Sequence, residues 1–206
     1  MPPILLTPAL VLASIVLPGF ADALEARSPT PLTFEEGHGS VITIGDWIPQ
    51  SGDRLLINVE GNVGTIVHTS GDRLTFPVIS GQRRTLHYLG RRYFGATPQK
   101  EWVVKALDIQ GDRVTYGRSG RFLRLYDQGT RTHYGIHGHR DEEVMFGRPD
   151  RFQSMGCVIV REEVMDLLIK AFAVNEGEIA VVTHGGNVQP RHDHTVVVGG
   201  GGQEVD

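Results

Sequence analysis

The chain has 206 residues, of which 40% are hydrophobic, 21% are charged and 7% are aromatic, and its formal net charge is -4. This composition excludes a collagen, a coiled coil and a mostly disordered chain, and the length suits one domain with appendages or two small domains. Only three basic residues are lysines, and no long basic run occurs. We therefore expect no nucleic-acid partner.

The first 23 residues are predicted to be a secretory signal peptide. Residues 4–23 form an apolar run that is interrupted by Pro8 and Pro18, and the small residues Ala21 and Ala23 resemble an Ala-x-Ala cleavage site. An uncleaved membrane anchor and a buried amino-terminal helix are the alternatives, because about 20 apolar residues can also cross a bilayer. We expect a periplasmic or secreted protein that meets a membrane only through this segment, if it stays uncleaved.

Residues 24–40 combine Pro, Ser, Thr, Gly and Glu with little apolar periodicity and are predicted to be a linker. A catalytic domain is expected over residues 41–184, and the Gly-rich, polar residues 185–206 are predicted to be a flexible tail. Short apolar or alternating runs separated by turn residues predict strands in the first part of the domain. These runs lie at 41–47, 54–69, 73–80, 101–109, 112–117 and 121–127.

The second part of the domain begins with residues 131–154, which show no sustained period and are predicted to be a loop that carries chemistry. Apolar residues at helical spacing then predict a helix near 161–174, and residues 178–183 are predicted to be the last strand. The expected fold is mainly β, a β-rich α+β mixed sheet or sandwich with this one helix packed on it.

Cys157 is the single cysteine of the chain, so no internal disulfide can form. It is expected at a junction between loop and helix, where a helix start and a nearby imidazole would lower the pKa of the thiol. Gly156, immediately before it, would let a carbonyl group approach backbone amides that form an oxyanion hole. His137 has no spacing that forces it beside Cys157, so the fold must bring the two together.

Two alternatives compete with a catalytic Cys157 and His137 pair. A lone cysteine is often a small buried hydrophobic residue, although an unpaired thiol in an oxidising compartment is a candidate reactive group. His133, His137, His139 and Cys157 also match the ligand preferences of zinc, but their spacings do not place them on one face of a helix or strand. A catalytic thiol should react with iodoacetamide well below the ordinary thiol pKa of about 8.5, whereas a buried structural thiol should not.

Three sequence elements together resemble the L,D-transpeptidase (YkuD-type) catalytic domain family. The first is His137-Gly138, a spacer of 16 residues, and then Ser154-Met-Gly-Cys157-Val. The others are Phe76-Pro-Val-Ile-Ser-Gly81 and Thr97-Pro-Gln-Lys-Glu-Trp102, and the resemblance covers roughly residues 54–183. It implies the mixed-sheet fold of that family.

The resemblance implies that Cys157 is the nucleophile, that His137 is its base and that the Gly138 carbonyl orients the imidazole. The backbone N–H groups of Gly156 and Cys157 would form the oxyanion hole. The thiolate would attack the third residue of a peptidoglycan stem peptide, release D-alanine and form a thioester that an amine of a second stem resolves. Carbapenem-type inhibitors would acylate the same cysteine, and no metal or organic cofactor is implied.

Two other functions stay open from the sequence. A hydrolytic relative, either an L,D-carboxypeptidase or an amidase, would pass the acyl group to water. A catalytically silent cell-wall-binding module would have no reactive thiol.

The expected substrate-binding residues include departures from the family pattern. Ser154, Met155 and His139 are expected to line the cleft, but Met155 replaces the histidine of the family motif, and Ile159 stands where the family often has Arg or Asn. Arg161 is the nearest basic residue and is expected to bind a stem carboxylate. The arginine-rich segment at 83–92 is either a flap over an anionic wall polymer or, as we favour, a solvated loop.

Overall fold

The computed structural model describes residues 33–35 and 41–186. The predicted signal peptide and nearly all of the predicted tail lie outside these residues, as does the predicted linker apart from β1 (Thr33–Glu35), a strand paired with β2 (Val41–Thr43). Among the described residues, no helix has the length and apolar character needed to cross a membrane.

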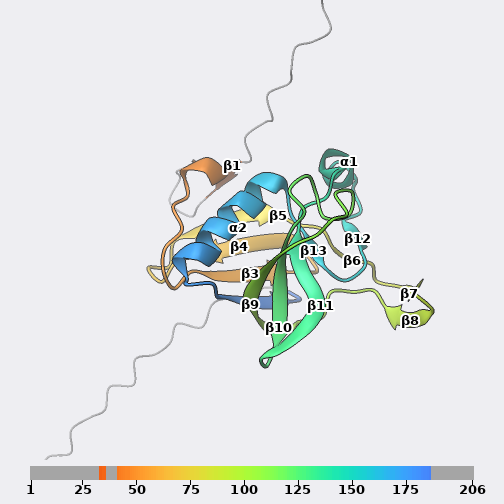
Figure 1. Ribbon diagram of the computed structural model, residues 1–206. Helices are drawn as coiled ribbons and strands as arrows, with labels where there is room; N and C mark the ends of the chain where they lie inside the picture. Colours follow the sequence, from red (N-terminus) through yellow and green to blue (C-terminus); the bar gives the residue numbers. More distant parts are fainter. Residues whose placement is uncertain (1–32, 36–40, 187–206) are drawn as a thin grey trace, which may run out of the picture. The chain divides into compact units, whose positions relative to one another are not determined.

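The main sheet is mixed and has eight strands (Figure 1). Its neighbours are antiparallel except for two parallel pairs, β13 with β11 and β14 with β3. In spatial order the strands are β13 (Val158–Ile159), β11 (Thr130–His137), β10 (Arg121–Asp127), β9 (Lys100–Ile109), β14 (Ile179–His184), β3 (Arg54–Asn58), β4 (Val63–Val67) and β5 (Arg73–Pro77). The expected mainly β fold with a mixed sheet is confirmed.

Smaller elements complete the domain. A two-stranded sheet joins β6 (Ser80–Gly81) to β12 (Phe152–Ser154), and a hairpin joins β7 (Thr85–Tyr88) to β8 (Arg91–Phe94). The helical elements are η1 (Ile44–Asp46), α1 (Glu142–Phe146) and α2 (Glu162–Val174).

Helix α2 packs its apolar stripe into the main core, as Figure 1 shows from its course along the sheet. Five of its residues are buried there: Val164, Met165, Leu167, Leu168 and Ala171. They meet buried side chains of the strands, including Leu55, Val104, Leu123 and Ile136. The helix expected near 161–174 is confirmed. Burial of its apolar side chains provides most of the free energy that stabilises α2.

Two segments differ from the sequence-based expectation. Residues 131–154 are not one loop, since they contain most of β11, all of α1 and β12. The outer half of β11 is largely exposed and carries polar residues, so the sequence shows no clean alternation. Residues 112–117 form turns rather than a strand, because the Asp112 carboxylate accepts the backbone N–H groups of Val114 and Thr115.

The Ser-Gly and Thr-Pro elements meet beside the Cys157 loop. The Gly81 N–H donates to the Thr97 hydroxyl at 2.9 Å, and a Cβ atom on Gly81 would collide with the Gly95 carbonyl. Gly81 also lies opposite Ser154 in the parallel pairing of β6 with β12. Only glycine at position 81 allows the backbone of β6 to approach that of Gly95 so closely. Through its pairing with β6, β12 is held in place just before the cysteine motif.

Truncation of Leu168 to alanine should lower the free energy of unfolding by about 2 to 5 kcal/mol, because its side chain is fully buried in the core. Val174→Ala is the matched control, since Val174 is exposed at the end of the same helix. Chemical denaturation of both variants measures the difference. Equal losses would contradict the assigned packing of α2.

Candidate functional site

The pairing of β11 with β13 brings Cys157 and His137 to one face of the sheet. Ile136 lies opposite Val158 and His137 opposite Ile159, in parallel register. Side chains alternate between faces along a strand, and Ile136 and Val158 both point into the core. Cys157 precedes Val158 by one residue, so its side chain projects from the same face as His137. The fold thus places the two side chains on one face, which the sequence spacing alone did not.

The Ser154 hydroxyl stabilises the cysteine loop through two hydrogen bonds to the backbone of that loop. Its hydroxyl donates to the Cys157 carbonyl at 2.5 Å and accepts the Gly156 N–H at 3.1 Å. Gly156 has a φ of 119°, and a Cβ atom there would lie 2.8 Å from the Tyr134 ring. Glycine is therefore required at this position, and its N–H donates to the Ser154 hydroxyl, so it is not free to act as an oxyanion donor in this arrangement.

The Cys157 thiol is protonated at rest. Its sulfur lies 3.9 Å from the His133 carbonyl, to which only an S–H group can donate. Burial raises the pKa of the thiol to about 11, although a hydrogen bond from the Gly135 backbone and the charge of Arg124 act in the opposite direction. The expected location at a helix start is wrong, because β13 follows Cys157 and α2 begins only at Glu162.

His137 is buried and neutral, and its orientation is fixed. Its Nδ1 lies 2.7 Å from the Gly138 carbonyl, to which it donates in the Nδ1–H tautomer, and the Thr115 backbone is a second hydrogen-bond partner of the ring. The imidazole stacks on Phe122, with ring centroids 5.5 Å apart, and contacts Tyr116 at 5.0 Å. Burial lowers the pKa of His137 to about 4, against the opposing effect of the Gly138 carbonyl.

Gly135 makes room for this stacking. A Cβ atom on Gly135 would collide with the Phe122 ring, which lies on the same face as His137. Phe122 in turn is covered by the Arg124 guanidinium, 4.3 Å from the ring centroid. The imidazole therefore has an aromatic support that holds the ring plane in one orientation.

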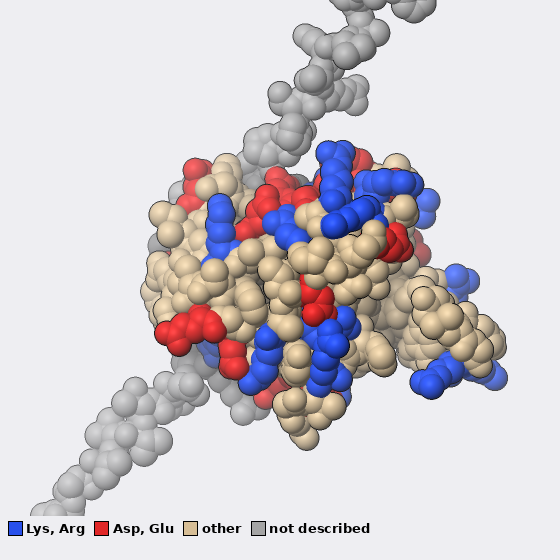
Figure 2. All heavy atoms as spheres, in the orientation of Figure 1, with Lys and Arg blue, Asp and Glu red and all other residues tan. Residues whose placement is uncertain are grey.

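The β7–β8 hairpin reaches the cysteine loop through Tyr93, whose hydroxyl donates to the Met155 carbonyl at 3.4 Å. The segment interpreted as a solvated loop is therefore an antiparallel hairpin. It is exposed to solvent: Leu89 at its tip is 84% exposed, and Tyr88 and Phe94 are also exposed. Figure 2 shows basic side chains and no acidic ones on the visible face of this projection. The Met155 side chain is also exposed, beside the contact.

Arg161 does not have the free guanidinium expected for substrate binding. It forms an ion pair with Glu143 of α1 at 2.6 Å and lies over the Phe146 ring, 4.9 Å from its centroid. Next to it, the Glu142 carboxylate accepts the Glu162 N–H at 2.8 Å and so caps α2. Arg161 and its neighbours therefore join α1 to α2.

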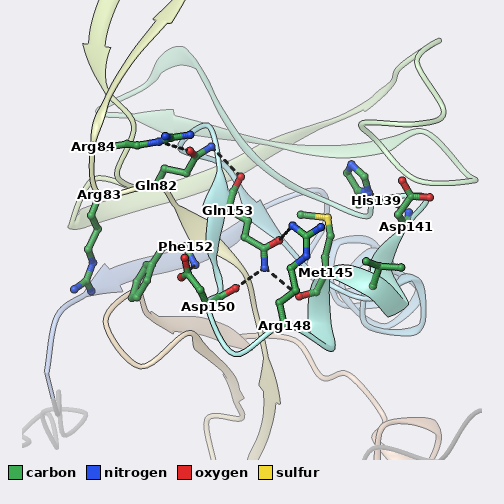
Figure 3. A pocket seen from close by; sticks show the side chains of 11 residues that line it. Gln82, Arg83, Arg84, His139, Asp141, Met145, Arg148, Asp150, Phe152 and Gln153 are labelled. Carbon is green, nitrogen blue, oxygen red and sulfur yellow. Dashed lines mark hydrogen bonds between the residues drawn. The ribbon is translucent and has the colours of Figure 1, made fainter.

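His139 lies between His137 and α1 in the chain and faces a cavity. Its Nδ1 accepts the Asp141 N–H at 3.1 Å, and its side chain lines a cavity formed by α1 and the base of the hairpin (Figure 3). Within the part of the chain that the structure describes, no three His, Cys, Asp or Glu side chains are grouped as metal ligands. The zinc alternative built on His133, His137, His139 and Cys157 is not formed.

Sequence reasoning missed the aromatic residues of the site. Tyr116 belongs to a segment predicted as a strand, and Phe122 resembles an ordinary strand residue. Tyr93 directly follows the segment 83–92 that was interpreted as a solvated loop. Each acts through a contact with a residue distant in the chain, namely His137 or Met155. No local pattern identifies such contacts.

Comparison with known proteins identifies the domain. The family model of the L,D-transpeptidase catalytic domain (YkuD) matches residues 52–198. No curated protein sequence matches the chain.

Several solved structures resemble this one at low sequence identity. The L,D-transpeptidase of Xylanimonas cellulosilytica is 21% identical, with a TM-score of 0.48, covering 66% of this chain and 61% of that one. The helical cell shape determining protein Pgp2 of Campylobacter jejuni is 18% identical, with a TM-score of 0.47 and coverages of 70% and 54%. Bd1075 of Bdellovibrio bacteriovorus is 18% identical, with a TM-score of 0.46 and coverages of 65% and 48%. The chain thus spans about half to three fifths of these structures.

Alkylation of Cys157 by iodoacetamide should accelerate with rising pH without reaching a plateau below pH of about 10. A raised thiol pKa means that less thiolate is present at each lower pH, which reverses the expectation from sequence. The urea-unfolded protein is the control and should show a midpoint near the ordinary value of about 8.5. A midpoint below that value in the folded protein would show a preformed thiolate instead.

The buried imidazole should make the fold less stable in acid. The folded pKa of His137 lies below the ordinary value of 6.5, so the unfolded chain binds the proton first, and stability falls as pH drops from 6.5 to about 4. The loss from this group is about 3 kcal/mol. His137→Gln removes it, so denaturation curves of the variant should lack this part of the pH dependence. Identical pH dependence in both proteins would refute the shift.

Proposed function

Because the chain belongs to the L,D-transpeptidase catalytic domain family, we propose that it is a cysteine acyltransferase that cross-links peptidoglycan stem peptides outside the cytoplasm. The observation that supports the proposal is the joint placement of Cys157 and His137 on one face, with the imidazole held by the Gly138 carbonyl. A nucleophile and an oriented base are the minimum equipment for acyl transfer.

The first step follows from the protonation states of the pair. Since the thiol is neutral at rest, His137 acts as a general base that takes the thiol proton on Nε2 while sulfur attacks the peptide carbonyl. For this the thiol exchanges its bond to the His133 carbonyl for one to the imidazole, by rotation about the Cα–Cβ bond of Cys157. An imidazole with a pKa of about 4 is unprotonated at neutral pH, but it is a weak base, so proton transfer from the thiol must accompany attack on the carbonyl carbon rather than precede it.

The tetrahedral intermediate places its negative oxygen against the Cys157 N–H. Collapse breaks the peptide bond, and the imidazolium gives its proton to the departing amino group of D-alanine, which leaves a thioester on Cys157. An amine of a second stem then attacks the thioester, loses its proton to His137 and restores the thiol. Water in place of the amine gives a tripeptide and makes the same site a carboxypeptidase.

Intact mass spectrometry with a carbapenem and with tetrapeptide stems tests this proposal. Wild type should form a covalent adduct and release D-alanine, Cys157→Ala should do neither, and His137→Gln should lose about a hundredfold or more in acylation rate. His133→Gln is the matched control, because only the backbone of His133 contacts the thiol, and its rate should stay near that of wild type.

The products separate the candidate functions. Cross-linked dimers support transpeptidation, and tripeptide alone supports hydrolysis. Absence of both adduct and product, with a thiol that still reacts with iodoacetamide at high pH, would overturn the proposed activity.

A further inference from the structure

A cavity of about 820 Å³ lies beside the cysteine loop, between the base of the β7–β8 hairpin and α1 (Figure 3). Gln153, at its centre, directly precedes Ser154, and the backbone N–H of Gln82 donates to the Ser154 carbonyl at 2.9 Å. His139, two residues after His137, lies on the side opposite Gln82. The cavity thus borders both ends of the segment that joins His137 to Cys157.

Gln153 positions the guanidinium group of Arg148 in this cavity. Its side-chain amide nitrogen donates to the carbonyls of Met145, at 3.1 Å, and of Asp150, at 2.5 Å. Both amide hydrogens are therefore used, and the Oε1 atom faces Arg148, whose Nη1 donates to it at 3.2 Å. Figure 3 shows these bonds together.

Gln82 positions Arg84 in a similar way. Its amide nitrogen donates to the Gln153 carbonyl at 3.1 Å, and its Oε1 accepts the Arg84 Nε–H at 2.7 Å. Each glutamine leaves most of the N–H groups of its arginine unused, since a guanidinium has five. Two guanidinium groups thus lie at one cavity, and each has N–H groups that its glutamine does not use.

The charge of these two arginines is not neutralised by ion pairs. Over residues 33–35 and 41–186, neither Arg84 nor Arg148 has a carboxylate within ion-pair distance. Arg83 also lines the cavity but lies over the Phe152 ring, 3.9 Å from its centroid. Two carboxylates, Asp141 and Asp150, line it as well, so the cavity suits a ligand that carries both acid and amino groups.

We propose that this cavity binds the free carboxylate on the third, diamino-acid residue of a stem peptide through Arg84 and Arg148, an inference that rests on the proposed function. A guanidinium recognises a carboxylate through paired N–H groups, and the spare donors here provide them. The position that is often basic in the family is Ile159, and Arg161 is held by Glu143. Arg84 and Arg148 supply the positive charge from a different place, the hairpin base and the turn after α1.

Binding to the Cys157→Ala protein, followed by NMR titration, tests the proposal without turnover. The probes are a tetrapeptide stem with a free carboxylate on its third, diamino-acid residue and the same peptide with that carboxylate amidated. Adding Arg148→Gln or Arg84→Gln should weaken binding of the free acid about tenfold and binding of the amide less than twofold. Arg92→Gln is the matched control, because Arg92 is an exposed hairpin arginine outside the cavity, and should change neither.

The outcomes are distinct from those of the activity test. Equal weakening for acid and amide, no weakening, or no saturable binding of either peptide overturns the carboxylate site. Wild type that binds the acid selectively but releases no D-alanine supports the carboxylate site and contradicts the proposed activity. Lysine at position 84 or 148 should restore part of the preference for the free acid over the amide. Thermal melting checks that each variant is folded.

Kinetics with wild-type Cys157 assign the carboxylate to one of the two stems. A rise in the KM for D-alanine release in the Arg148→Gln enzyme places it on the donor stem. A rise only in the acceptor concentration needed for dimer formation places it on the acceptor stem.

Discussion

The parallel pairing of β11 with β13 is the contact on which the site depends. It is short, yet it closes the segment between His137 and Cys157 into a loop whose two ends lie side by side. The pairing is buried on its core face by Ile136 and Val158, so hydrophobic packing holds Cys157 and His137 at a fixed register. A slip of one residue would turn Cys157 into the core and separate it from the imidazole.

Burial acts on both members of the pair in the same sense, because it disfavours whichever form is charged. The thiol keeps its proton and the imidazole stays without one, so the resting site is neutral. A neutral pair costs little to bury, whereas a thiolate and an imidazolium would have to be desolvated together. In the proposed reaction, charge develops only when a carbonyl group arrives and the oxyanion has a donor.

The sequence predicted the elements that repeat a local pattern. The stripe of Leu168 and its neighbours predicted α2, and the alternation at 121–127 predicted β10. The Cys157 motif pointed to a reactive loop because glycine and cysteine at that spacing have a chemical reason to be together. The residues suggested that His137 pairs with Cys157, whereas the role of the Gly138 carbonyl came only from family resemblance.

What the sequence could not supply depends on contacts between distant residues. Arg161 was expected to bind substrate, but its guanidinium forms an ion pair with Glu143. The Cys157 thiol was expected to have a lowered pKa, but burial raises that pKa. The segment at 112–117 alternates like a strand, but Asp112 bonds its own backbone and turns the chain. In each case a tertiary or side-chain contact outweighed a local preference.

The loop between the two reacting residues is anchored at both ends by the sheet, and Glu142 fastens its middle to α2. Residues that face the cavity, such as Arg148 and Gln153, lie between these anchors and contribute little to the core. Substitutions at these positions can therefore change the cavity without disturbing the register of Cys157 and His137. The proposed reaction and the proposed recognition of the stem peptide thus depend on separate parts of one short stretch of chain.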